Sequence, residues 1–142
     1  MQNALRKLEL ARADLQNFMD VAGGGVSPAS DAERQAITAA HNAFAELLTA
    51  RNAMNRAIQA NEGGDSASAI GHKNQAALAV SNIWARGHYN MLSRVRFTGH
   101  VESHRKDALN SLKAARSAFS GSRNWLPIAV GAAIGTGILL FG

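Results

Sequence analysis

The chain has no cysteine, only two prolines, and only two acidic residues after position 65. Without cysteine it cannot form disulfides, use a thiolate nucleophile or bind zinc through sulfur. Scarce proline removes the strongest helix breaker, and the abundant alanine favours helices. Its 142 residues are enough for one domain of ordinary size. We therefore expect an all-α fold.

Motifs of the common enzyme classes are missing as well. The glycine runs at 23–25 and 63–64 lack the Lys-Ser/Thr partner of a phosphate-binding loop, and no serine lies in a nucleophile elbow. His100 and His104 share a helix face, but the His-Glu-x-x-His motif and a third metal ligand are absent, so we interpret them as solvated histidines. We expect no enzymatic activity, no metal, no cofactor and no small-molecule substrate.

The charge is distributed unevenly along the chain. Residues 1–65 hold six Lys/Arg and eight Asp/Glu, a net charge of −2. Residues 66–142 hold nine Lys/Arg and two Asp/Glu, a net charge of +7. A mildly acidic first half thus precedes a basic second half, which suits an anionic partner such as lipid headgroups or nucleic acid.

Residues 1–64 have the spacing of a mildly acidic helical hairpin. Apolar residues at alternating three- and four-residue steps predict a helix over 2–22, ended by three glycines. Ser30 and Glu33 fit a capping box that begins a second helix, and this helix ends near Gly63. The connection is short, so the two helices should be antiparallel. The residues predicted to make the helix–helix contacts are Leu8, Leu15, Phe18, Ile37, Phe44, Leu47 and Met54.

Residues 65–119 form the basic helical segment, with two further amphipathic helices. The first runs from Asp65 or Ser66 to about Leu92, and the second from about His100 to Phe119. The apolar stripes expected to be buried are Ile70, Ala77, Val80, Trp84 and Met91 in the first helix, and Val101, Ala108, Leu112, Ala115 and Phe119 in the second. Many of these residues are alanine, so one chain buries a thin core, and we expect it to rely on copies of itself, a larger assembly or a membrane.

A basic band lies between Trp84 and Lys106. The residues predicted to contact an anionic partner are Arg86, Arg94, Arg96, Arg105 and Lys106, with Trp84, Tyr89 and Phe97 interleaved among them. Arginine with aromatics can grip phosphates and stack on bases, and it can also dock at a bilayer surface. The alternative is a solvated basic face whose aromatics point into the core.

After a flexible joint over 120–124, the eighteen residues from Trp125 to Gly142 carry no charge. A helix over 126–141 would be about 24 Å long, slightly short of the roughly 30 Å bilayer core. Trp125 would lie at the interface, and Gly131, Gly135 and Gly137 would let another helix approach closely. This apolar helix is expected to span a membrane, with the body on the cytoplasmic side, or to form the core of an oligomer.

The uncharged segment resembles the membrane anchor of the ElaB/YqjD family in Trp125, in the run Val130-Gly131-Ala132-Ala133-Ile134-Gly135 and in the pair Leu139-Leu140. That resemblance implies a tail-anchored helical protein of the bacterial inner membrane that associates with ribosomes. It covers about an eighth of the chain, which lacks the arginines that usually end that family. The overall layout is also similar to small helical virion proteins of tailed phages, including internal proteins that are ejected.

These features together predict a non-enzymatic structural or assembly protein. Its helical body would dock on a partner or self-assemble, with the apolar helix in a membrane or an oligomer core. A virion component is the favoured setting. A cellular tail-anchored adaptor and a nucleic-acid-binding module that uses the basic band are the alternatives.

Overall fold

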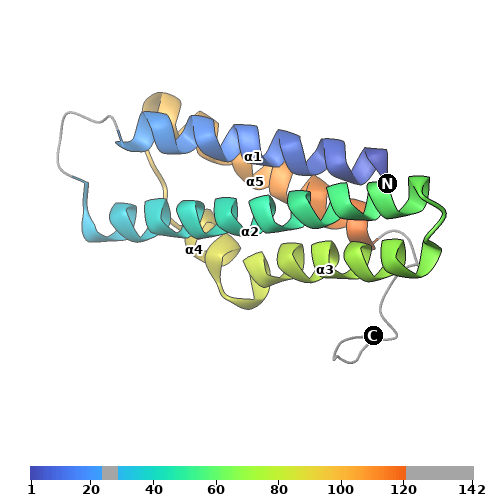
Figure 1. Ribbon diagram of the computed structural model, residues 1–142. Helices are drawn as coiled ribbons and strands as arrows, with labels where there is room; N and C mark the ends of the chain where they lie inside the picture. The colour runs from blue at the N-terminus through green and yellow to red at the C-terminus, as the bar shows by residue number, and fades with distance from the viewer. Residues whose placement is uncertain (24–28, 121–142) are drawn as a thin grey trace.

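The computed structural model describes residues 1–23 and 29–120, and every regular element in this part of the chain is an α-helix (Figure 1). The helices are α1 (Gln2–Gly23), α2 (Asp31–Glu62), α3 (Ser66–Ala85), α4 (His88–Arg94) and α5 (Gly99–Ser120). The all-α prediction is confirmed. Within the described ranges, no helix has both the length and the apolar character needed to cross a membrane. The predicted apolar helix over 125–142 lies outside the described residues, as does the joint apart from Ser120, the last residue of α5.

The first two helices lie antiparallel (Figure 1). The predicted capping box at the start of α2 is confirmed: the Glu33 N–H donates to Ser30 Oγ at 3.1 Å, and the Ser30 N–H donates to Glu33 Oε1 at 2.9 Å. These bonds satisfy two N–H groups that a helix start would otherwise leave unpaired. Arg51 of α2 reaches back to α1, where its Nη1 lies 3.8 Å from Glu9 Oε2.

The core runs along α2, which contacts α1 on one side and α3 and α4 on the other. Five of the seven predicted packing residues are fully buried: Leu8, Leu15, Phe18, Leu47 and Met54. The other two, Ile37 and Phe44, are only half-buried and lie at the edge of the core. The reason is that the buried side of α2 is centred on alanines, among them Ala36, Ala40, Ala43, Ala50 and Ala57. The Arg12 guanidinium covers the ring of Phe44, 5.6 Å from its centroid.

The prediction of one continuous helix up to Leu92 is wrong. α3 ends at Ala85, and the chain turns at Gly87, whose φ of +81° lies in the left-handed region that favours glycine. The turn directs α4 against α2. Trp84 and Tyr89 stack across it, with ring centroids 4.7 Å apart and planes 20° from parallel. The two basic helices of the prediction are therefore three.

The buried stripe of α3 also differs from the predicted one. Ala69, Ala76 and Ile83 face the core together with Val80, whereas Ile70 is 45% exposed. α3 is apolar or uncharged around most of its circumference, so spacing alone does not identify its buried side.

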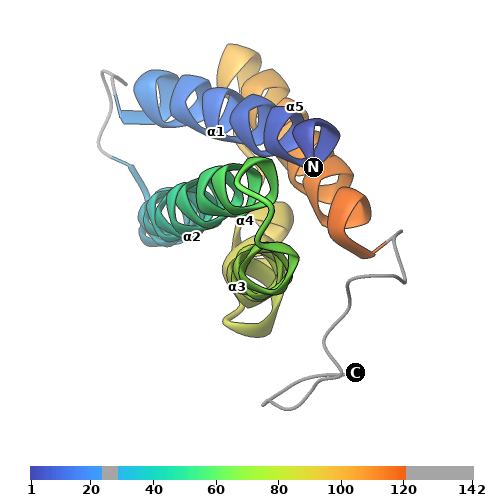
Figure 2. The same cartoon turned by 45° about the vertical axis from the view of Figure 1, so that its right-hand side comes forward.

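In Figure 2, α1 lies between α5 and α2, and α2 lies between α1 and α3. The inner side of α5 carries Ala108, Leu112, Ala115 and Phe119, all buried, with Val101 half-buried. Ser111 of α5 donates a hydrogen bond to Asp14 of α1. α5 ends at the same end of the bundle at which α1 and α3 begin (Figures 1 and 2).

The turn between α3 and α4 can be tested at Gly87. We expect Gly87→Ala to lower the free energy of unfolding by about 1–2 kcal/mol, because an L-residue is strained at positive φ. Gly87→Asn should cost less, since asparagine tolerates this conformation better than alanine does. A Cβ at this position meets no heavy atom within 4 Å, so crowding does not contribute. Denaturant unfolding of the three proteins measures their relative stabilities. Equal stability of wild type and Gly87→Ala would contradict a left-handed conformation at Gly87.

Candidate interaction surfaces

Arg105 joins the end of α4 to the start of α5. Its guanidinium donates from Nε and Nη2 to the two carboxylate oxygens of Glu102, at 2.9 and 2.5 Å. Nη1 donates to the carbonyl oxygens of Leu92 and Ser93, at 3.0 and 2.8 Å. Those carbonyls belong to the last turn of α4, where helices lack acceptor partners and favour positive charge. One side chain thus holds two helix ends together.

Glu102 extends the same arrangement to the connecting segment. Its Oε1 also accepts a hydrogen bond from the Phe97 N–H at 2.8 Å. The hydrogen bond from Arg105, helped by that of Phe97 and by the charges of Arg105 and Lys106, lowers the pKa of Glu102 to about 2 despite partial burial. We call this set of residues, Leu92, Ser93, Phe97, Glu102 and Arg105, the α4–α5 clamp.

The clamp corrects one of the predicted binding residues. Arg105 is only 4% exposed and is bonded to Glu102 and to backbone carbonyls, so it is not a surface contact for an anionic partner. Its role in the described structure is internal. The sequence contains the signal for this role, because Glu102 precedes Arg105 by three residues on one helix face.

Among the other cations of the basic band, Arg86 lies apart from Arg94. Arg94, Arg96 and Lys106 are exposed. Arg86 is exposed as well, but it precedes the start of α4 while Arg94 ends it, and its Nη1 lies 3.1 Å from Glu46 Oε2 of α2. Arg94 and Arg96 lie between the clamp residues Ser93 and Phe97, two positions apart in the chain.

The aromatic side chains of the band are engaged within the fold. Phe97 meets Phe18 of α1 edge-to-face, with ring centroids 5.2 Å apart. Trp84 stacks on Tyr89, and the Arg116 guanidinium of α5 lies 4.6 Å from the Trp84 ring centroid. Base stacking needs a free aromatic face, so these contacts disfavour the use of the three rings on nucleic acid.

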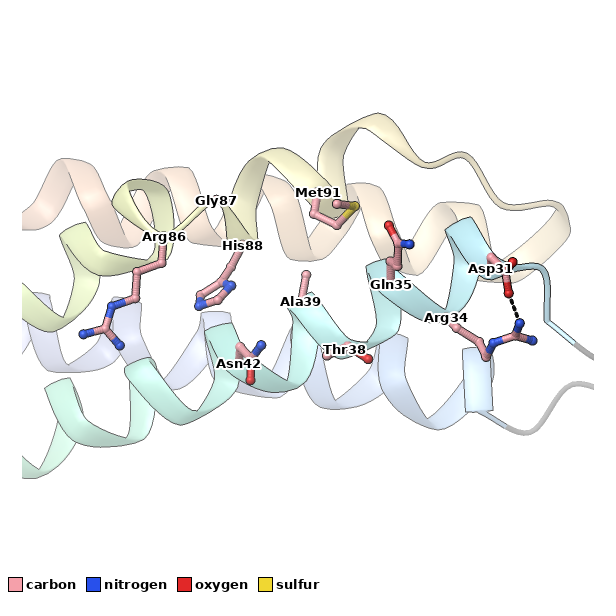
Figure 3. A pocket seen from close by; sticks show the side chains of 10 residues that line it. All are labelled: Asp31, Arg34, Gln35, Thr38, Ala39, Asn42, Arg86, Gly87, His88 and Met91. Carbon is pink, nitrogen blue, oxygen red and sulfur yellow. Dashed lines mark hydrogen bonds and ion pairs between the residues drawn. The ribbon is translucent and has the colours of Figure 1, made fainter.

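A groove of about 460 Å³ lies between the first half of α2 and the α3–α4 turn (Figure 3). Gln35, Thr38 and Asn42 line it from α2, opposite Arg86 and His88. Seven of its ten lining residues have polar or charged side chains, and the groove is open to solvent, so it lacks the enclosure of typical small-molecule sites. Over the described ranges, no group of three or more His, Cys, Asp or Glu side chains could hold a metal.

A surface that the sequence reasoning missed lies on the outer side of α3. Ile70, which the spacing predicts to be buried, is 45% exposed, and Leu78 is 59% exposed. The signal available in the sequence is the near absence of charge: 66–85 contains Lys73 and no acidic residue. We call this side, with Ala67, Ile70, Gly71, Asn74, Leu78, Ser81 and Ala85, the outer face of α3.

The clamp should make stability depend on acid pH. Because folding lowers the pKa of Glu102 from 4.5 to about 2, its contribution is fully present above pH 4.5 and is lost as the pH falls toward 2. We expect Glu102→Gln to be less stable than wild type at pH 6 and the difference to shrink by pH 2. Denaturant unfolding across this range measures it. Asp107→Asn, at an exposed carboxylate of α5, is the control and should show a smaller change.

Comparison with models of protein families, with curated protein sequences and with solved structures finds no match to this chain. No relative therefore assigns a function to the clamp, to Arg94 and Arg96, or to the outer face of α3.

Proposed function

We propose that this protein is a non-enzymatic assembly protein. Its helical body docks on an anionic partner or on further copies of itself, and its uncharged segment, residues 125–142, inserts into a membrane. The body is then a spacer between two attachment points at opposite ends of α5.

The observation that carries the proposal is the distance between those two points. Arg94 and Arg96 lie just before α5 begins, and the uncharged segment follows soon after α5 ends. The 22 residues of α5 correspond to about 33 Å of helix. Arg94 and Arg96 are therefore held away from the site of insertion, where they can meet a second partner while the protein is attached.

The end of the body supports the membrane role of the segment. Phe119 is the last buried residue of the core, so the described helices pack together up to the point where the joint begins. Lys113 and Arg116 are exposed on the last turns of α5, and Arg123 follows in the joint. Cations next to an apolar segment are attracted to anionic headgroups and favour retention of the body on the cytoplasmic side.

Two settings fit this arrangement. One is a virion component whose apolar segment enters an envelope. The other is a cellular tail-anchored adaptor, which agrees with the ElaB/YqjD-like residues of the segment and would place a ribosome opposite Arg94 and Arg96. Burial of the segment in an oligomer core is the alternative to insertion. Nucleic-acid binding is the lesser candidate, because Trp84, Tyr89 and Phe97 already have partners within the fold.

Insertion can be tested with vesicles of phosphatidylcholine and phosphatidylglycerol followed by carbonate extraction. We expect the full-length protein to stay in the membrane pellet. Ile134→Lys with Ile138→Lys should release it, because a lysine at the centre of a membrane helix, as at position 134, costs about 2.5–3.5 kcal/mol and the second lysine adds to that cost. Leu10→Lys, a matched change at an exposed apolar residue of α1, should leave it in the pellet.

Two results would overturn membrane insertion. One is complete extraction of the full-length protein by carbonate. The other is the formation of discrete oligomers without lipid, disrupted by the Ile134 and Ile138 lysines, which would support the oligomer core instead. Light scattering of the same samples separates these two results.

The two ends of α5 can be compared with paired charge removals. Lys113→Gln with Arg116→Gln should weaken association with the anionic vesicles by roughly tenfold, because both cations are on the last turns of α5, which the uncharged segment follows in the chain. Arg94→Gln with Arg96→Gln removes the same charge at the far end and should leave association nearly unchanged. Circular dichroism confirms that both variants are folded, and equal losses in the two variants would contradict the separation of the two ends.

A further inference from the structure

The outer face of α3 has no partner among the described helices. Across residues 1–23 and 29–120, four large apolar side chains are exposed: Met1, Leu10, Ile70 and Leu78. Two of them, Ile70 and Leu78, share α3 and lie eight residues apart, which places them on one side of the helix about two turns from each other. That side is opposite the buried residues Ala76 and Ile83.

The surroundings of Ile70 and Leu78 lack charge and bulk. A helix side that faces water usually carries charged residues, but the outer face of α3 carries none. Gly71 lies beside Ile70, and a Cβ built there meets no atom within 4 Å. Glycine in a helix interior costs about 1 kcal/mol relative to alanine, and no contact in the described structure uses the missing side chain. A second helix or segment could approach closely here.

We propose that the outer face of α3 binds the chain's own uncharged segment, residues 125–142, whenever that segment is outside a membrane. The position of the segment is the first argument. α5 ends at the end of the bundle where α3 begins (Figures 1 and 2), and α3 and α5 contact each other. The four residues 121–124 span up to about 14 Å when extended, which is enough to pass around the first turn of α3, since a helix is about 10–12 Å in diameter.

Length and chemistry match as well. Eighteen residues as a helix are about 27 Å long, and the 20 residues of α3 are about 30 Å long. Both partners are uncharged on the surfaces concerned, so docking leaves no charge unpaired. Each partner also removes apolar surface of the other from water, which neither can do alone.

Tethering favours the chain's own segment over a second copy of the protein. One face of a 30 Å helix buries less than the roughly 800 Å² per partner of a standard interface, so a dimer formed through it would be weak. A segment joined by four residues has a millimolar effective concentration and can occupy a weak site. The inference does not depend on membrane insertion, although it predicts that insertion must displace the segment from α3.

The absence of cysteine allows a direct test by disulfide trapping. Leu78→Cys is combined, in the full-length protein, with a single cysteine at Ala129, Ala132, Ala133 or Thr136, and the protein is oxidised at low concentration without lipid. We expect an intrachain disulfide with at least one partner, visible as a monomer of altered mobility on a non-reducing gel. Leu10→Cys, at a residue of similar exposure on α1, is the control and should not form it.

Other outcomes overturn the proposal. Crosslinked dimers in place of monomers would assign the outer face of α3 to a second copy. If no Leu78→Cys pair forms an intrachain disulfide, or if Leu10→Cys forms it to the same extent, the segment does not dock on the outer face of α3.

A second measurement separates this proposal from membrane insertion. The trapped protein should not insert into the anionic vesicles until dithiothreitol opens the disulfide. Leu78→Glu should speed insertion by about tenfold compared with Leu10→Glu, because it weakens the docked state alone. If the disulfide forms but the reduced protein is extracted by carbonate, docking stands and the membrane function fails. If insertion occurs without any intrachain disulfide, the membrane function stands and docking fails.

Discussion

The fold depends on how closely its helices can approach α2. The buried side of α2 consists mostly of alanines, and each alanine presents one methyl group to its neighbours. Because that side is thin, α1 can pack on one flank while α3 and α4 pack on the other. Larger side chains such as Leu8, Phe18 and Ile83 then fill the layers between the helices. Other large side chains have no room there, so Ile37 and Phe44 lie at the edge, and Ile70 and Leu78 lie outside.

This constraint also explains how much of the structure could be predicted from the sequence. Helix starts and ends depend on neighbours in the chain, so the capping box at Ser30 and Glu33 could be identified from two residues. The buried sides of α1 and α5 could be identified because charged residues mark their opposite sides. α3 has almost no charge, and only its packing on α2 determines that Ala69 and Ala76 are buried in place of Ile70. In the sequence, Gly87 can be interpreted as a glycine tolerated inside a helix. Only the contact of α4 with α2 shows that the chain must turn there.

The same limit applies to the candidate site, because the sequence does not show which cations are buried and which are exposed. Composition groups Arg86, Arg94, Arg96, Arg105 and Lys106 into one basic band, whereas the fold gives them different neighbours. Arg105 is buried because the last turn of α4 and the Glu102 carboxylate each accept two hydrogen bonds from it. By fixing the segment between α4 and α5, the clamp holds Arg94 and Arg96 at one end of the body. Fewer cations are therefore available to a partner than the sequence indicates, and two of them, Arg94 and Arg96, have a defined position.

The outer face of α3 and residues 125–142 present the same physical difficulty, since the former exposes apolar side chains without charge and the latter is an apolar sequence without charge. A membrane can cover the segment, but it leaves Ile70 and Leu78 uncovered unless the body itself lies on the bilayer. The proposed docking would cover both at once without a further partner, and the removal of apolar surface from water would favour it. Transfer of the segment to a membrane must then exceed the free energy of docking, which delays insertion until a suitable bilayer is reached. A weak docking site allows this transfer better than a strong one, because a segment bound tightly to α3 would not be released.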